Sequence, residues 1–192
     1  MDKYLGYDAE TGGLYARQHS LLTLYMATAV LEFGKFRILR DLDLKIKPNE
    51  DECYNVTAGA LAINKIDLVK HDKEAITIDA AAEKVYYFLK EESEDGRNKL
   101  IRIGQNEPFD KDFVINHLLK EKILRLFTDY HTRDTAVVAG FLKDKGLLPR
   151  NASISLKNLA KALNISVPDS DWHTAKGDVN TMFRVYERFL TL

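Results

Sequence analysis

The chain has 192 residues, 45% of them hydrophobic, which is enough for a domain with a substantial core. Its 28 lysines and arginines nearly balance its 29 aspartates and glutamates, so the formal net charge of −1 excludes a protein that coats nucleic acid through overall basic charge. The one cysteine, Cys53, excludes an internal disulfide and a cysteine-based zinc site.

Three strands are predicted in the first half of the chain, one at residues 3–8 and two in the segment 20–48, which bends near Gly34. The first part of that segment is almost wholly apolar, which is typical of a central strand, and the second part alternates, which is typical of a half-exposed one. Asp79 is placed to cap the longer of two predicted helices. The two helices are predicted at residues 57–65 and 79–89, and a charged loop follows at residues 91–98.

Strands and helices alternate in the second half of the chain. Strands are predicted at residues 99–104 and 129–134, and a helix begins within QNEPFD at 105–110. Further helices cover residues 136–146, 155–165 and 174–190. Antiparallel strands followed by alternating strands and helices predict an α/β fold, with a mixed five-stranded central sheet flanked by helices on both faces.

No internal repeat, low-complexity stretch or linker marks a domain boundary, so we expect residues 1–192 to form a single domain. No uninterrupted apolar run approaches ~18 residues, and the start of the chain lacks the basic and apolar regions of a signal peptide. These features, with the lone cysteine, predict a cytoplasmic protein and no membrane partner.

Two acids, Asp8 and Glu10, lie two positions apart near the end of the first strand, beside a Thr-Gly-Gly turn. Side chains at such spacing point to the same face of a sheet. Two carboxylates aimed at one point repel each other unless a positive group lies between them, and Mg²⁺ prefers hard oxygen ligands. On spacing alone, a solvated strand end with two ordinary acids explains the pair equally well.

A third acid, Asp110, follows Pro108 in the first turn of a predicted helix. An acid there also complements the helix dipole, which is its simplest explanation when it is taken alone. The turn follows a strand, however, and ligands of α/β sheets collect where strands end and helices begin.

The last predicted helix places a fourth acid on its apolar stripe. Residues at spacings of four, seven and eleven positions share that face: Asp178, Met182, Val185 and Phe189. A carboxylate on a stripe that faces the core is costly unless a partner compensates it. His173 precedes this helix and is of the type that accepts a proton near neutral pH, although a lone histidine there is more often a surface residue.

Together these four acids come from three separate segments and lie at the ends of strands or helices. Four carboxylates can hold two Mg²⁺ ions about 3.5–4 Å apart, the arrangement that hydrolyses phosphodiesters. The sequence therefore predicts a two-metal centre built by Asp8, Glu10, Asp110 and Asp178.

Three motifs resemble those of the DEDD 3′–5′ exonucleases. YDAETGGL at 7–14 resembles D-x-E-T-x-G-L, NEPFD at 106–110 resembles N-x-x-F-D, and HTAKGD at 173–178 resembles H-x-x-x-x-D. The motifs occur in the family's order, and the third carries the histidine of the DEDDh branch, the DnaQ-like or ribonuclease T type. The resemblance covers nearly the whole chain and implies a ribonuclease H-like fold.

The resemblance also implies roles for individual residues. The four acids would bind two Mg²⁺ (or Mn²⁺) ions, and His173 would be the general base for the attacking water. The substrate-binding residues that it implies are Ala9, Thr11, Leu14, Asn64, Asn106 and Phe109. Among these, Thr11 would meet the terminal sugar and Leu14 would wedge against the last bases. Asp134, which ends a predicted strand before a helix, is interpreted as a structural cap rather than a ligand.

The activity implied is hydrolysis of a nucleic acid, DNA in our interpretation, from the 3′ end of a single or frayed strand to nucleoside 5′-monophosphates. A homodimer and a DNA polymerase or another replication or repair protein are further partners that the family allows. Three alternatives stay open from the sequence: an exoribonuclease that trims RNA, a non-catalytic nucleic-acid-binding module of the same fold, and a metal-binding α/β domain that acts on another phosphate ester. Leu14 and Phe109 favour nucleic acid over a small phosphate ester.

Overall fold

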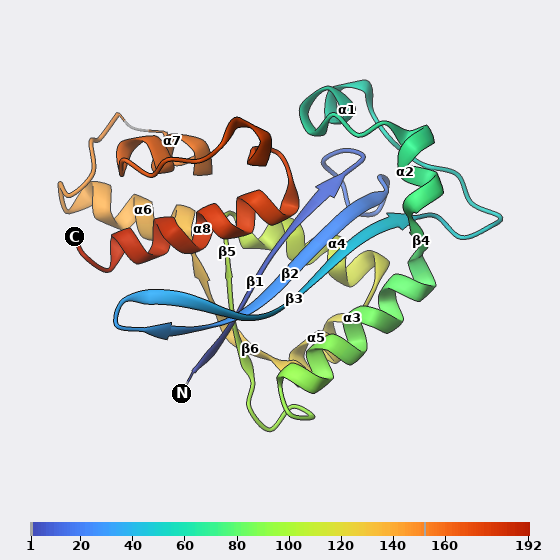
Figure 1. Cartoon of the computed structure of the whole chain (residues 1–192), viewed down its shortest axis with the longest axis horizontal. Coiled ribbons are helices and arrows are strands. Elements are labelled where there is room, and N and C mark those ends of the chain that lie inside the picture. The colour runs from blue at the N-terminus through green and yellow to red at the C-terminus, as the bar shows by residue number, and fades with distance from the viewer. Residues whose placement is uncertain (1, 152) are drawn as a thin grey trace.

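The computed structural model describes residues 2–151 and 153–192. Its centre is a six-stranded mixed sheet with the order β4-β3-β2-β1-β5-β6 (Figure 1). The strands are β1 (Lys3–Thr11), β2 (Leu21–Glu32), β3 (Lys35–Lys47), β4 (Ile76–Thr77), β5 (Leu100–Gly104) and β6 (Thr128–Asp134). The α-helices are α1 (Ala58–Asn64), α2 (Leu68–Glu74), α3 (Ile78–Glu92), α4 (Glu107–His117), α5 (Glu121–Phe127), α6 (Thr135–Asp144), α7 (Leu156–Ala162) and α8 (Ala175–Phe189).

The strand β1 lies inside the sheet, antiparallel to β2 and parallel to β5. β2 and β3 form a long hairpin whose turn consists of Phe33 and Gly34, both with positive φ, at 51° and 75°. Two consecutive residues in this region are the signature of a tight two-residue hairpin turn. The bend predicted near Gly34 is therefore confirmed.

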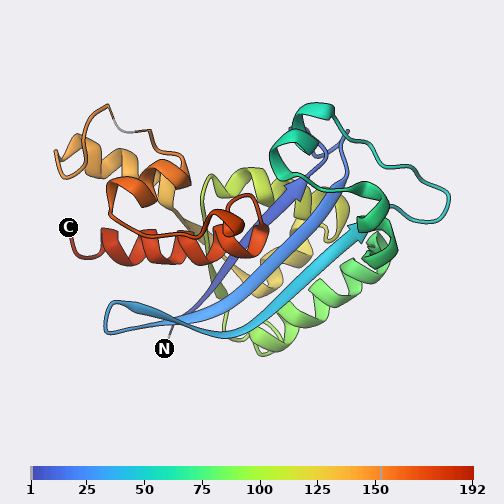
Figure 2. The ribbon, with the colours of Figure 1, turned by 45° about the horizontal axis from the view of Figure 1, so that its top comes forward.

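Helices cover both faces of the sheet (Figures 1 and 2). On one face α3, α4 and α5 bury their apolar side chains against β1, β2 and β3, including Val85, Phe113 and Phe127. On the other face α8 packs on the central strands, and α6 and α7 pack in turn against α8. Within the part of the chain that the structure describes, no helix is long and apolar enough to cross a bilayer.

The close contact between β1 and α8 depends on a glycine. A Cβ atom on Gly6 would lie 2.6 Å from the ring of Phe183, so a larger residue would require side chains of α8 to shift. The backbone of β1 can therefore approach α8 closely just upstream of Asp8.

The structure confirms the predicted α/β class and adds elements that the sequence pattern did not reveal. The sheet has six strands rather than five, because the two-residue strand β4 pairs with β3. The short helices α2 and α5 were not predicted. The cap of α3 is Thr77 instead of Asp79, and α3 continues through Glu92 into the stretch predicted to be a solvated loop, where Ser93 is fully buried.

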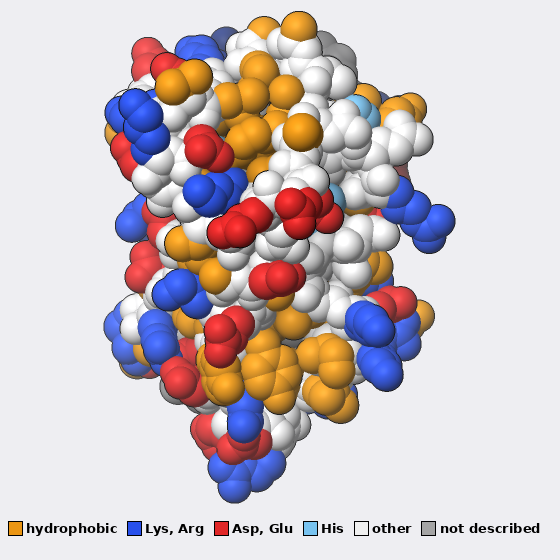
Figure 3. Space-filling model, turned by 90° about the vertical axis from the view of Figure 1, so that its right-hand side faces the viewer, with side chains coloured by type: hydrophobic (Ala, Val, Ile, Leu, Met, Phe, Trp, Pro, Cys, Tyr) orange, Lys and Arg blue, Asp and Glu red, His pale blue; other side chains and the backbone are white. Residues whose placement is uncertain are grey.

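Charges of both signs are mixed on the surface. On the face shown in Figure 3, which carries α2 and the edge strand β4, acidic, basic and apolar side chains are interspersed. No continuous basic surface is visible among the described residues on that face. A polyanion would therefore have to be held there by local features, as the composition predicts.

Asp134 connects two helices to the sheet. One of its oxygens accepts hydrogen bonds from the amides of Ala136 at 2.8 Å and Asn106 at 3.1 Å, and the other accepts from Glu107 at 2.8 Å. It therefore caps α6 and also fixes the start of α4, whose N-cap residue, Asn106, makes no side-chain capping hydrogen bond. The interpretation of Asp134 as a structural cap is confirmed.

We expect Asp134→Ala to lower the free energy of unfolding by about 1–4 kcal/mol, because two helix starts lose their acceptor and one cap contributes about 0.5–2 kcal/mol. Urea unfolding followed by circular dichroism measures the loss. Asp67→Ala is the matched control, since Asp67 caps only the exposed helix α2. Equal losses in the two variants would contradict the double role of Asp134.

Candidate metal centre and adjoining groove

Three of the four predicted acids meet at one point. Asp8 and Glu10 lie two positions apart on β1, and Asp178 lies in the first turn of α8. One carboxylate oxygen from each of the three lies within 4.8 Å of the others. The shared face predicted for the two strand residues thus coincides with the face on which α8 packs.

Asp110 approaches this group from the other side of the sheet. It is buried in the first turn of α4, and its Oδ1 accepts a hydrogen bond of 3.0 Å from the backbone amide of Ala9. Its carboxylate does not belong to the group of three, but its charge acts directly on Asp8. The structure therefore places Asp110 beside the cluster, anchored to the backbone between Asp8 and Glu10.

Burial and mutual repulsion make the ionised acids unfavourable. Burial raises the pKa of the Asp8 carboxyl well above its usual range, and the charges of the other three acids raise it further. Burial and the charges of Asp178 and Asp110 raise the pKa of Glu10 to about 8. Burial also raises the pKa of Asp110 to about 8 and that of Asp178 to about 6. All the charged neighbours that raise the pKa of Asp8 are acids.

This donor set fits a hard divalent cation. Oδ1 of Asp178 is buried and has no hydrogen-bond partner among the residues that the structure describes. A buried carboxylate oxygen without a donor is costly, and a cation held by the three converging carboxylates would remove that cost. Carboxylate oxygens are the ligands that Mg²⁺ and related ions prefer.

His173 lies in the turn before α8 and is exposed, with a left-handed backbone at φ 61°. The turn around it is held by Thr174, whose hydroxyl donates to the carbonyl of Asp171 at 2.7 Å and accepts from the amide of Gly177 at 3.1 Å. A Cβ on Gly177 would clash with that same carbonyl. The backbone carrying His173 is therefore fixed one turn away from Asp178, and its ring is open to solvent.

A groove of about 530 Å³ adjoins the acids. It contains five of the six predicted substrate-binding residues, namely Ala9, Thr11, Leu14, Asn64 and Phe109, together with Glu10. Leu14 is 74% exposed at its edge, an unusual position for a leucine that has no partner. Asn106 does not line the groove; it lies at the start of α4 in a left-handed conformation.

The wall of the groove is built by contacts between β1 and α1. The side-chain amide of Asn64 donates to the carbonyl of Thr11 at 3.2 Å, and the Thr11 hydroxyl donates to the carbonyl of Gly13 at 2.8 Å. Gly12 is required because a Cβ there would clash with the carbonyl of Asn55. The close approach that the glycine pair permits is thus to the chain's own segment at Asn55.

Sequence reasoning missed several groove residues, among them a pair of aromatic rings. Tyr15 and His19 line the groove, and their rings stack with centroids 6.0 Å apart. Nδ1 of His19 accepts a hydrogen bond of 3.2 Å from the Tyr15 amide. Both residues lie in an irregular loop, where no periodic pattern marks the inward-facing positions.

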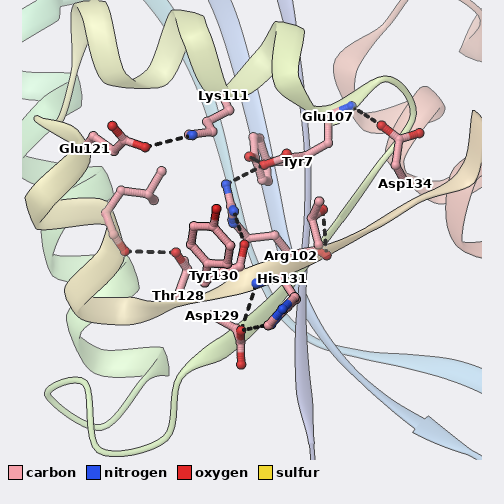
Figure 4. Close-up of polar contacts among 12 residues, drawn as sticks. Tyr7, Arg102, Glu107, Lys111, Glu121, Thr128, Asp129, Tyr130, His131 and Asp134 are labelled. Atoms are coloured by element: carbon pink, nitrogen blue, oxygen red, sulfur yellow. Dashed lines mark hydrogen bonds and ion pairs between the residues drawn. The ribbon is translucent and has the colours of Figure 1, made fainter. Parts of the chain in front are cut away.

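A buried ionic network holds α4 against the sheet (Figure 4). The Tyr7 hydroxyl donates to Glu107, and Nη1 of Arg102 donates to the same carboxylate at 2.7 Å. Burial, reinforced by the charge of Glu107, raises the pKa of Tyr7, so this hydroxyl remains a donor. Because Glu107 is one helical turn before Asp110, the network sets the position of that acid.

Neither a protein-family model nor a curated protein matches the chain. Among solved structures, the zinc-bound complex of E. coli exonuclease I with single-stranded DNA is 20% identical, with a TM-score of 0.72 and coverage of 100% of this chain and 41% of that chain. E. coli exonuclease I in complex with a dT13 oligonucleotide is 18% identical, with a TM-score of 0.69 and coverage of 97% and 40%. The ExoI/SSB-Ct complex is 19% identical, with a TM-score of 0.71 and coverage of 100% and 41%.

These similarities show the fold. The chain spans about two fifths of the length of the exonuclease I structures that it matches. The predicted ribonuclease H-like fold is confirmed, while membership of the DEDDh branch stays a prediction.

We expect the metal-free protein to lose stability as the pH rises from 5.5 to 8.5. The pKa of Glu10 is higher in the folded state, at about 8, than its ordinary value of 4.5, so the folded state binds this proton more tightly. The resulting stabilisation is complete below the ordinary pKa and is lost as the pH rises through about 8. Magnesium should reduce the loss by compensating the ionised acids.

Glu10→Gln tests this expectation by thermal unfolding in EDTA. At pH 8.5 the variant should have a Tm several degrees above that of the wild type, since ~1 kcal/mol shifts Tm by about 2–4 °C in a chain of this size. Glu50→Gln, at an exposed acid, should leave Tm unchanged. A Glu10→Gln variant that is no more stable than the wild type at pH 8.5 would show that the ionised Glu10 carboxylate does not destabilise the folded state.

Glu107→Ala should lower the free energy of unfolding by about 3–5 kcal/mol, because it leaves the buried Arg102 charge without its partner. Tyr7→Phe removes one hydrogen bond and should cost about 0.5–1.5 kcal/mol. Glu121→Ala, which breaks only surface ion pairs, should cost about 0–1 kcal/mol. Urea unfolding measures all three, and a loss for Glu107→Ala no larger than for Glu121→Ala would contradict a structural role for the network.

Proposed function

We propose that the chain is a metal-dependent 3′–5′ exonuclease that acts on single-stranded or frayed DNA ends and releases nucleoside 5′-monophosphates. The observation that carries this proposal is the cluster of Asp8, Glu10 and Asp178 beside a groove with apolar edges. Uncompensated carboxylates suit a cation, and an adjoining groove with exposed apolar side chains suits a nucleotide base.

The comparisons support the proposal at the level of the fold. The similar structures are named as exonuclease I, and some of them are complexes with single-stranded DNA or a dT13 oligonucleotide. Because this chain covers about two fifths of those proteins, their activity is carried over here only as a proposal.

The four acids would be the metal ligands. Asp8, Glu10 and Asp178, with Asp110, would hold two Mg²⁺ or Mn²⁺ ions. Bound divalent cations supply Lewis acidity, which activates a water and stabilises the leaving oxygen in phosphodiester hydrolysis.

Two groove residues would position the end of the strand. Leu14 and Phe109 would bracket the terminal base, and the backbone around Thr11 would face the terminal sugar. Holding the strand in this way places its last phosphodiester at the acids, so that the reaction starts from an oriented complex.

His173 would accept the proton of the attacking water. Its exposed ring is carried by a backbone fixed next to α8, and an imidazole nitrogen can accept a proton from a water. The strained left-handed conformation of this residue is of the kind that occurs at functional sites.

Nucleic acid is the partner that the groove supports. The structure named ExoI/SSB-Ct records a second protein bound to one of the similar proteins, and a replication or repair partner is proposed here by analogy. A homodimer and a DNA polymerase partner stay predictions.

The test is a gel assay with 5′-labelled single-stranded DNA and its RNA counterpart, in Mg²⁺, Mn²⁺ or EDTA. We expect a metal-dependent ladder that shortens from the 3′ end, absent in Asp8→Asn and unchanged in Asp112→Asn, which alters an exposed acid of α4. Faster cleavage of RNA would favour an exoribonuclease. Binding without cleavage would instead indicate a non-catalytic module.

His173→Ala should lower the turnover rate by ~10²–10⁴, the usual contribution of a general base, while metal and DNA affinity stay unchanged. Single-turnover cleavage measures the rate, and fluorescence anisotropy in EDTA measures DNA binding. Turnover equal to that of the wild type would remove His173 from the mechanism.

A further inference from the structure

A second pocket, of about 380 Å³, lies between α4, α5 and β6 (Figure 4). None of its lining residues belongs to the acid cluster or lines the groove. A bulge in β6 forms one wall of the pocket. Leu100 pairs with Thr128 and Arg102 pairs with Thr132, so β6 contains two more residues than β5 between these pairs. The bulge turns Tyr130 outward, so that 70% of this residue is exposed.

Arg102 lines this pocket and keeps an unused donor. Its Nη1 donates to Glu107 at 2.7 Å and its Nη2 donates to the carbonyl of Tyr130 at 3.2 Å. Its buried Nε has no hydrogen-bond partner within residues 2–151 and 153–192, although the residue is only 6% exposed. A buried guanidinium N–H without an acceptor is destabilising, so Glu107 and Tyr130 satisfy the Arg102 guanidinium only in part.

The rim of the pocket has one positive charge in excess. Lys111 and Arg125 both bind the same oxygen of Glu121, at 2.9 Å and 3.0 Å. One carboxylate cannot neutralise two cations, and the other acid lining the pocket, Glu107, is already paired with Arg102. Among the residues that line the pocket, cations therefore outnumber acids by one, and the nearby Asp129 lies 3.5 Å from Nδ1 of the lining residue His131.

The aromatic ring of Tyr130 lies beside the positive charge of Arg125. The guanidinium of Arg125 lies over the ring of Tyr130, 5.3 Å from its centroid. Exposed aromatic rings next to cations are the usual means of holding a base together with its phosphate. The pocket volume is also in the range of small-ligand sites, which begins at about 300 Å³.

We propose that this pocket binds a nucleotide, with the base stacked on Tyr130 and the phosphate between Lys111 and Arg125 in front of Arg102. The nucleotide comes either from a nucleic-acid strand or from a free nucleoside monophosphate, and both present the same chemistry. This site is separate from the acid cluster and does not depend on its activity.

The experiment is a titration of ¹⁵N-labelled protein in EDTA, followed through backbone amide shifts, with dTMP, thymidine, inorganic phosphate and a dT10 oligonucleotide. Wild type and Asp8→Asn are compared, so that neither metal nor turnover contributes. We expect saturable shifts of the amides of 128–132 with dTMP in both proteins, and weaker ones with thymidine or phosphate alone. A lower Kd for dT10 than for dTMP would identify a strand as the source, and a similar Kd would identify the free nucleotide.

Variants at exposed positions make the assignment specific. Tyr130→Ala and Arg125→Gln should each raise the Kd for dTMP by about tenfold, as expected for a lost base stack or a lost phosphate contact. Tyr87→Ala and Lys122→Gln alter an exposed tyrosine and an exposed lysine outside the pocket and should leave the Kd unchanged.

Three results would overturn the proposal. They are no shift at 128–132, shifts confined to the groove around Leu14 and Phe109, and an unchanged Kd in Tyr130→Ala. Because every measurement is made without metal, a failed nuclease assay would leave this result unaffected.

Discussion

The repulsion among four acids, one buried and three half-buried, is the constraint on which the rest of the structure depends. Asp8, Glu10 and Asp178 converge within 4.8 Å, and the charges of its neighbours raise the pKa of Asp8 without any opposing cation. Such a cluster would separate if its supports were free to move. Its supports are therefore rigid: β1 lies between two strands, and α8 packs on it through the glycine at position 6.

The fourth acid requires a different support, because α4 lies on the opposite face of the sheet. Asp110 is anchored to the end of β1 by the amide of Ala9, and its charge also raises the pKa of Asp8. The start of α4 makes no side-chain cap of its own and is instead held by Asp134 and by the pairing of Glu107 with Arg102. A buried ion pair adds little stability compared with apolar packing, but it fixes geometry, and here the fixed element carries an acid of the candidate site.

The sequence predicted those features that rest on local rules. The two-residue spacing predicted Asp8 and Glu10 on one face of the sheet, and the apolar stripe of α8 predicted that Asp178 faces the sheet. Asp134 lies at the N-cap position between a strand and a helix, where a capping side chain is expected. Some short elements were not predicted. Helix α2 buries His71 but shows no apolar stripe, α5 runs directly into β6 with no turn residue to mark its end, and β4 spans two residues. The positions of Tyr15, His19 and Asn106 relative to the groove depend on loop geometry, which no periodic pattern encodes.

The first two turns of α4 bring the separate features of the molecule together. Successive residues of a helix point in directions about 100° apart, since there are about 3.6 residues in each turn. Phe109 can therefore line the groove, Asp110 can reach the acid cluster, and Lys111 can line the pocket beside β6, all from consecutive positions. Any shift of this helix would move all three at once. The network beneath it, from Tyr7 through Glu107 to Arg102, thus links the orientation of the candidate catalytic acid to the floor of the second pocket.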